Sequence, residues 1–138
     1  MILAAGISLV AAACSGGGST APKGTATVAN GTVNVTANSL AFDVGTINVQ
    51  GGAAFTIHFT NAEAVPHNIA VYPQSGDAIA KGEVITGPSA TADLPVPALQ
   101  PGTYPFRCDV HPQQMTGMIV VGAPAGSSPA GSPSASPS

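Results

Sequence analysis

The stretch FTIHFT at residues 55–60 alternates apolar and polar side chains with a period of two. Successive side chains of a β-strand point to opposite faces, so this pattern is typical of a strand with one buried face. The stretch VNVT at residues 33–36 repeats the alternation. Neither stretch has the spacing of three and four residues that an amphipathic helix requires. Both therefore predict half-buried strands.

Similar short segments recur along the middle of the chain, separated by turn-forming pairs such as Gly51-Gly52, Gly87-Pro88 and Pro101-Gly102. Only residues 77–81 have some character of a helical turn. Regular strands with this punctuation predict an all-β fold, an antiparallel sandwich or barrel of about eight strands. Further strands are expected at residues 39–43, 46–49, 67–72, 82–86, 90–94, 103–108 and 115–121.

Composition excludes several classes of protein. The chain has 138 residues, of which 7% are charged, and its net charge is −3. With only three basic residues it lacks the cationic stripe that nucleic-acid binding needs, so no nucleic-acid partner is expected. No apolar run reaches the roughly 18–20 residues that span a bilayer, which excludes a polytopic membrane protein. The length allows one domain, which we expect to be monomeric.

The two ends of the chain differ from its middle. Residues 1–14 form a short apolar stretch that ends in small residues and Cys14, with Gly and Ser directly after it. This resembles the signal peptide of bacterial lipoproteins, and the resemblance implies acylation of Cys14, a membrane anchor and an extracytoplasmic or periplasmic location. Residues 15–25 and 123–138 are rich in Gly, Ser, Pro and Ala and predict a flexible spacer and a disordered tail. The expected domain covers residues 26–122.

The segment FRCDVHPQQMTG at residues 106–117 gathers three metal-binding residue types in one loop between two expected strands. Two residues separate Cys108 from His111, and three separate His111 from Met115. A loop this short can fold all three side chains around a common point. A further histidine, His67, begins another expected strand upstream.

One thiolate, two imidazoles and one thioether form a specific donor set. Three ligands of the Cys/His/His type with a weak axial Met describe a blue-copper electron-transfer site. Zinc prefers four strong ligands, and a thioether is a poor fourth. Each residue alone has an ordinary explanation: a small core cysteine, a methionine that fills a gap, a histidine in a turn. The four together predict a copper site.

The motif His67-Asn68, followed later by residues 102–117, resembles a cupredoxin of the plastocyanin/amicyanin type. The matching positions are Gly102, Thr103, Tyr104, Phe106, Cys108, His111, Pro112, Met115 and Gly117. The resemblance covers essentially the whole domain and implies a Greek-key β-sandwich with one type 1 copper ion near one end. It implies His67, Cys108 and His111 as equatorial ligands, Met115 as the axial ligand, and Asn68 and Pro112 as residues that support them. The spacing from His111 to Met115 lies between those of amicyanin and plastocyanin, which leaves the reduction potential open.

Two residues with metal-binding side chains are expected to lie outside this ligand set. His58 alternates with the apolar residues of 55–59, so it should face solvent. Met118 lies in the returning strand, where packing or lining the surface near the site is its expected role. Met118 is the only competitor of Met115 for the axial position.

These features favour a single-electron carrier in which copper alternates between Cu(II) and Cu(I). An enzyme is not expected, because four protein ligands fill the metal and no catalytic Ser/His/Asp set is visible. Transient redox partners are expected to dock near His111, which is followed by the uncharged Pro112, Gln113 and Gln114. The alternative is copper storage, delivery or resistance, which Met-rich or His-rich tracts would favour. A third possibility is a sandwich that has lost its metal.

Overall fold

The structure of the chain, a computed structural model, describes residues 23–126. Cys14, most of the expected spacer and the tail beyond residue 126 lie outside these residues. Every regular element between residues 23 and 126 is a strand, which confirms the all-β class. Over the same range, no helix has the length and apolar character needed to cross a membrane.

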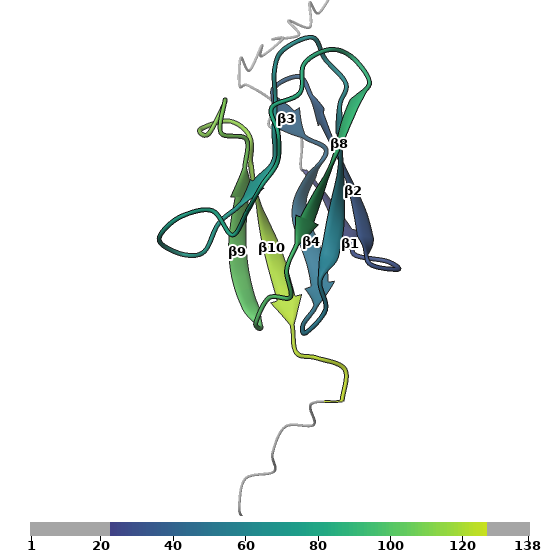
Figure 1. The fold of residues 1–138 in the computed structure, drawn as a ribbon, viewed down its shortest axis with the longest axis vertical. Helices are drawn as coiled ribbons and strands as arrows, with labels where there is room; N and C mark the ends of the chain where they lie inside the picture. Colours follow the sequence, from purple (N-terminus) through teal and green to yellow (C-terminus); the bar gives the residue numbers. More distant parts are fainter. Residues whose placement is uncertain (1–22, 127–138) are drawn as a thin grey trace, which may run out of the picture.

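Within the described residues, ten strands form two sheets that pack as a sandwich (Figure 1). The six-stranded sheet contains, in spatial order, β1 (Gly24–Thr27), β4 (Val44–Gln50), β10 (Thr116–Gly122), β9 (Gly102–Arg107), β6 (Ala70–Val71) and β7 (Ala80–Lys81). The four-stranded sheet contains β3 (Ala41–Phe42), β2 (Thr32–Asn38), β5 (Phe55–Asn61) and β8 (Ala90–Val96). The expected sandwich is therefore confirmed.

The sheets are mixed, and the expectation of an antiparallel arrangement was wrong. β2 pairs with β5 in parallel, as do β1 and β10 with β4. The reason is that the chain alternates between the layers: β1 and β4 belong to one sheet, β2 and β5 to the other. Strands that run in the same direction thereby become neighbours.

The period-two pattern places apolar side chains between the sheets as expected. In β5 the residues Phe55, Ile57 and Phe59 are buried, and β2 shows the same alternation. Removing one such side chain fully from water stabilises the fold by about 1.5–3 kcal/mol. The ring of Phe42 lies between those of Phe59 and Phe106, with centroids 6.2 and 5.4 Å away, so an aromatic cluster joins the two layers.

Several expected strands are shorter than the sequence suggested. Only residues 70–71 of the expected strand 67–72 pair in a ladder, because the backbone amide of Asn68 donates to the sulfur of Cys108. The expected strand 82–86 is irregular apart from an isolated bridge between Ile85 and His67. The expected helical turn at 77–81 is absent, and β7 occupies its last two residues.

One strand begins earlier than expected. β1 starts at Gly24, inside the stretch read as a spacer, since its small residues GTAT carry little apolar signal. Residues 23–126 form ten strands rather than about eight, and three of them (β3, β6 and β7) have only two residues each.

The strand directions place the loop after β5 and the loop after β9 at the same end of the sandwich, the upper end in Figure 1. β5 and β9 both run toward this end, and β10 begins there, antiparallel to β9. The loops that follow β5 and β9 carry His67 and Cys108 respectively.

Candidate metal centre

A buried polar side chain shapes the loop after β5. Asn61 occupies an inward position of the strand and is fully buried. Its amide nitrogen donates to the carbonyls of Val65 and Ile85, at 2.8 and 3.0 Å, and its oxygen accepts the backbone N–H of Glu63 at 3.0 Å. Asn61 therefore joins two loops and fixes the path of the chain toward His67.

Backbone hydrogen bonds close the loop between β9 and β10. The N–H of Cys108 donates to the carbonyl of Met115 at 2.9 Å, and the N–H of Met115 donates to the carbonyl of His111 at 3.0 Å. These bonds fold residues 108–115 into a compact turn. The turn brings the three candidate residues of this segment together, as the spacing predicted.

The ligand atoms of His67, Cys108 and His111 all lie within 4.8 Å of one another. The sulfur of Cys108 is 3.7 Å from Nδ1 of His67 and 4.0 Å from Nδ1 of His111. His67, Cys108 and Met115 are fully buried, whereas His111 is half-buried. One imidazole of the cluster therefore reaches the surface.

Glu63 determines which nitrogen of the His67 ring faces Cys108. Its Oε1 lies 2.9 Å from Nε2 of His67 and 3.0 Å from the backbone nitrogen of Leu40. The N–H of Leu40 lowers the pKa of Glu63 most, and the bond to His67 lowers it further against the opposing effect of burial. The carboxylate therefore accepts a hydrogen bond from the N–H at Nε2, which leaves the lone pair of Nδ1 directed toward Cys108.

Asn68 supports the thiol from the other side. Its backbone N–H points to the sulfur of Cys108 at 3.5 Å, and its side-chain oxygen accepts the N–H of Asp109 at 2.7 Å. The side chain of Asn68 also donates to the carbonyl of Gly82 and to the carboxylate of Asp109, both at 3.2 Å. Asn68 thus connects the segment after His67 to the cysteine-bearing loop.

The side chain of Asp109 is a second anchor of the same loop. Burial raises its pKa, but hydrogen bonds from Tyr72, Asn68, Lys81 and Arg107 outweigh that effect and hold the pKa below its ordinary value of 3.8. The carboxylate is therefore ionised and connects β7, β9 and Tyr72, the residue after β6, directly beside Cys108.

The donor set fits a soft first-row metal. Bonds of about 2.0–2.1 Å to nitrogen and about 2.3 Å to sulfur, meeting at 120°, would separate the two atoms by about 3.8 Å. The observed sulfur-to-nitrogen distances of 3.7 and 4.0 Å agree with this value. A thiol, two imidazoles and a buried thioether in one loop cluster match copper better than zinc.

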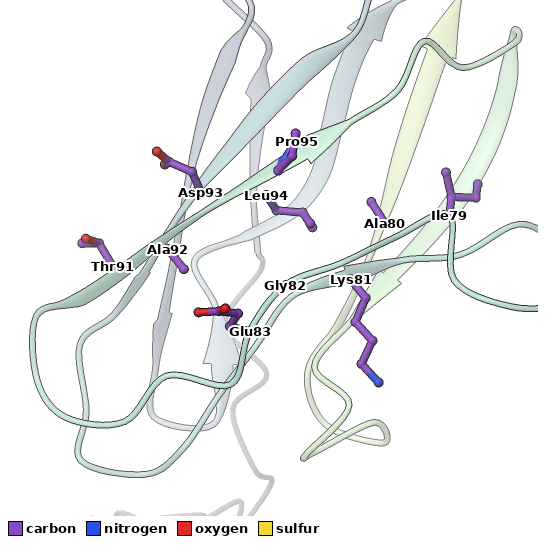
Figure 2. Close-up of a pocket in the computed structure, with 10 residues that line it drawn as sticks. All are labelled: Ile79, Ala80, Lys81, Gly82, Glu83, Thr91, Ala92, Asp93, Leu94 and Pro95. Atoms are coloured by element: carbon purple, nitrogen blue, oxygen red, sulfur yellow. The ribbon is translucent and has the colours of Figure 1, made fainter.

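A groove of about 520 Å³ lies elsewhere, between residues 79–83 and 91–95 (Figure 2). None of the four candidate ligands lines it. It follows the gap between β7 and β8, which are edge strands of different sheets. The groove is therefore not part of the metal cluster.

His58 faces solvent as strand parity predicted, and Met118 and Pro112 also lie at the surface. The side chain of His58 is 40% exposed and pairs with Asp93 of the neighbouring strand, 2.6 Å away, outside the metal cluster. Met118 is 37% exposed, in contrast to the buried Met115. Pro112 is exposed beside His111.

Four supporting residues were not anticipated as such: Asn61, Glu63, Tyr72 and Asp109. The sequence pattern could have identified Asn61, because it continues the series of inward-facing residues in β5 and a buried amide needs hydrogen-bond partners. No local pattern marked the other three, since Leu40 lies 23 residues from Glu63 and Tyr72 lies 37 residues from Asp109.

Comparisons with known proteins agree with this geometry. Residues 4–121 match the family model described as a cupredoxin-like domain. Amicyanin-alpha of Methylorubrum extorquens is 33% identical over 93 residues, which cover 66% of this chain and 72% of that protein. The "blue" copper protein auracyanin A of Chloroflexus aurantiacus has a similar fold, with a TM-score of 0.58 and 24% identity over 70% of this chain and 99% of that one.

A third similarity is partial. The copper-containing nitrite reductase of Neisseria meningitidis is 32% identical over 71 residues, half of this chain. The chain spans only 18% of the length of that enzyme. The match therefore concerns a part of the reductase.

Proposed function

Since this chain belongs to the cupredoxin-like domain family, we propose that it is an extracytoplasmic single-electron carrier with one type 1 copper ion. The observation that carries the proposal is the convergence of the ligand atoms of His67, Cys108 and His111 to within 4.8 Å of one another. The similarity to amicyanin-alpha and to auracyanin A supports it.

In this proposal His67, Cys108 and His111 are the equatorial ligands, and Met115 is the weak axial one. Bound copper supplies a one-electron couple between Cu(II) and Cu(I). The chain's own contacts would hold the ligands in place in either state: Glu63 orients His67, and the N–H of Asn68 points to the sulfur of Cys108. Burial of three of the four ligands excludes water, so little rearrangement accompanies the change of charge.

The exposed end of the cluster supports transient docking near His111. Exposed apolar side chains lie next to a ligand or to one of its partners: Leu40 bonds to Glu63, Val84 precedes the bridge residue Ile85, and Val65 and Val110 lie close to His67 and His111 in the chain. An uncharged surface of this kind fits a small interface, below about 1,200 Å², between a monomer and a redox partner.

We further propose that acylation of Cys14 anchors the protein outside the cytoplasm. Lys23 is the first described residue, and its Nζ lies 2.5 Å from the carbonyl of Thr116, next to Met115. The chain that follows an anchor on Cys14 would therefore enter the domain at the end that carries the proposed copper site. Labelling with a radioactive fatty acid, lost in Cys14→Ser, tests this step.

We do not propose an enzymatic activity. A catalytic copper needs an open position, whereas four side chains of this chain would fill the coordination sphere. The nitrite reductase similarity does not change this, because the chain spans 18% of that enzyme.

Titration with Cu(II) tests the proposed site. One equivalent should give an intense visible band from charge transfer between the Cys108 thiolate and the metal. Cys108→Ser should lose the band, because a serine oxygen cannot supply this transition, and Cys14→Ser is the matched control that should keep it. A colourless one-to-one complex of the unmodified chain would refute the type 1 site.

A further inference from the structure

The few cations of this acidic chain are not spread evenly. The sequence has three Lys and Arg residues against six Asp and Glu, yet Lys81 and Arg107 lie on either side of one carboxylate. Nζ of Lys81 is 3.2 Å from Oδ2 of Asp109, and Nε of Arg107 is 3.4 Å from Oδ1. The two cationic side chains are 61% and 45% exposed, against 19% for Asp109. The outward charge at this place is therefore positive.

Strand pairing makes this cluster a fixed surface. Lys81, Ala70 and Arg107 stand in one cross-strand row, and the inward neighbour Phe106 shows that the row faces outward. Ala70 itself is fully buried despite this outward position, so its neighbours cover it. The guanidinium carbon of Arg107 lies 4.0 Å from the ring centroid of Tyr72. We call Tyr72, Lys81 and Arg107 the cationic patch.

The cationic patch lies directly beside the proposed copper site. Arg107 and Asp109 are the chain neighbours of Cys108, and the hydroxyl of Tyr72 donates to Asp109 at 2.7 Å. The N–H of Asp109 in turn donates to Asn68, whose own N–H points to the sulfur of Cys108. The patch is thus connected to the thiol in two ways: through the backbone, and through the hydrogen bonds from Tyr72 to Asp109, from Asp109 to Asn68 and from Asn68 to the sulfur. It is distinct from the uncharged surface around His111.

The patch has unused hydrogen-bond donors. Over residues 23–126, Asp109 is the one carboxylate within ion-pair distance of Lys81 or Arg107, and it is Nε of the guanidinium that points to it. Figure 2 shows the ammonium of Lys81 pointing away from Glu83 and Asp93, which line the groove. The terminal groups of Arg107 and the remaining N–H bonds of Lys81 can therefore receive a carboxylate from outside.

We propose that the cationic patch is a second docking surface, which receives a carboxylate-rich protein that exchanges electrons with this chain. The inference rests on the proposed function for the electron exchange, but the binding of anions at the patch does not require copper. Charge complementarity identifies the occupant: with a net charge of −3, the molecule as a whole repels an acidic protein, whereas the two neighbouring cations of the patch attract it.

Binding can be mapped with hexacyanochromate(III), a paramagnetic and redox-inert trianion, on the full-length chain in its metal-free or reduced state. Proton resonances of Tyr72, Lys81 and Arg107 should broaden first. Lys81→Met should weaken the effect severalfold and, at an exposed edge position, cannot disrupt the core. Lys23→Met removes the same charge elsewhere and should leave the broadening at the patch in place. Equal broadening over the surface, or equal weakening in both variants, would overturn the proposal.

A decaglutamate peptide then distinguishes a protein docking site from a site for small anions. The peptide should displace the chromium complex and shift the same resonances. If the complex binds at the patch and the peptide does not displace it, the patch binds small anions and docking of an acidic protein is wrong.

The salt dependence of electron transfer gives an independent test. Ferricyanide takes one electron from Cu(I), which yields Cu(II) and ferrocyanide. Repulsion by the net charge would make this rate rise with ionic strength, whereas reaction at the patch should make it fall roughly three- to tenfold between about 10 and 500 mM salt. Lys81→Met should flatten this fall and Lys23→Met should not. A rate that rises with salt would contradict the proposal. Absence of any copper colour would refute the proposed function while leaving the chromium result interpretable.

Discussion

The carboxylate of Glu63 and the imidazole of His67 form a hydrogen bond of 2.9 Å between Oε1 and Nε2. Because Nε2 donates, Nδ1 faces the thiol of Cys108 at 3.7 Å with its lone pair free. The same carboxylate oxygen accepts the backbone N–H of Leu40 at 3.0 Å, so the acceptor itself is held in place. Glu63 therefore fixes both the orientation and the tautomer of a proposed ligand.

The lowered pKa of Glu63 predicts a loss of stability in acid. A carboxyl whose pKa is lower in the folded than in the unfolded chain stabilises the fold fully above the ordinary value, here 4.5. This contribution disappears as the pH falls through the lowered pKa. The urea midpoint of the metal-free chain should therefore drop below a pH of about 4.5, and less steeply in Glu63→Gln. Equal pH profiles for both chains would show that Glu63 contributes nothing.

The two methionines near the cluster should differ in their effect on the reduction potential. Met115→Leu keeps the volume of a buried side chain, so copper and colour should be retained at a cost below about 1.5 kcal/mol. The potential should rise, because the more highly charged Cu(II) gains more from an axial donor than Cu(I). Met118→Leu, at an exposed position of β10, is the control and should change little. Voltammetry in which only the Met118 variant shifts would reverse the axial assignment.

Gly117 has a packing role that a single methyl group tests. It stands opposite Phe106 in the β9–β10 ladder, and a Cβ on Gly117 would overlap the ring of Phe106. Gly117→Ala should therefore lower the free energy of unfolding by about 1–3 kcal/mol. Gly122→Ala in the same strand, where the nearest atom is a carbonyl oxygen 3.8 Å away, should have little effect. Similar urea midpoints for the two variants would exclude this role.

The sequence was sufficient for the features that depend on local pattern. Alternation in β2 and β5 predicted which side chains are buried, and the spacing of Cys108, His111 and Met115 predicted their common loop. The position of His58 followed from parity in the same way.

Features that depend on distant segments could not be predicted in this way. The parallel pairing of β2 with β5 results from the exchange of strands between sheets. The irregular segment after His67 results from the contact of Asn68 with Cys108, which is 40 residues away. The anchoring role of Asp109 depends on Tyr72 and Lys81, which come from distant segments of the chain.

In the proposed function the chain carries electrons rather than copper. The most direct measurement mixes the reduced, copper-loaded protein with a one-electron oxidant and follows the visible band, and in parallel mixes it with a thiol chelator and follows the bound copper. Because His67, Cys108 and Met115 are fully buried, we predict rapid recovery of colour with copper retained and slow loss to the chelator. Slow electron exchange together with loss of copper to the chelator within minutes would contradict the account and favour copper storage or delivery.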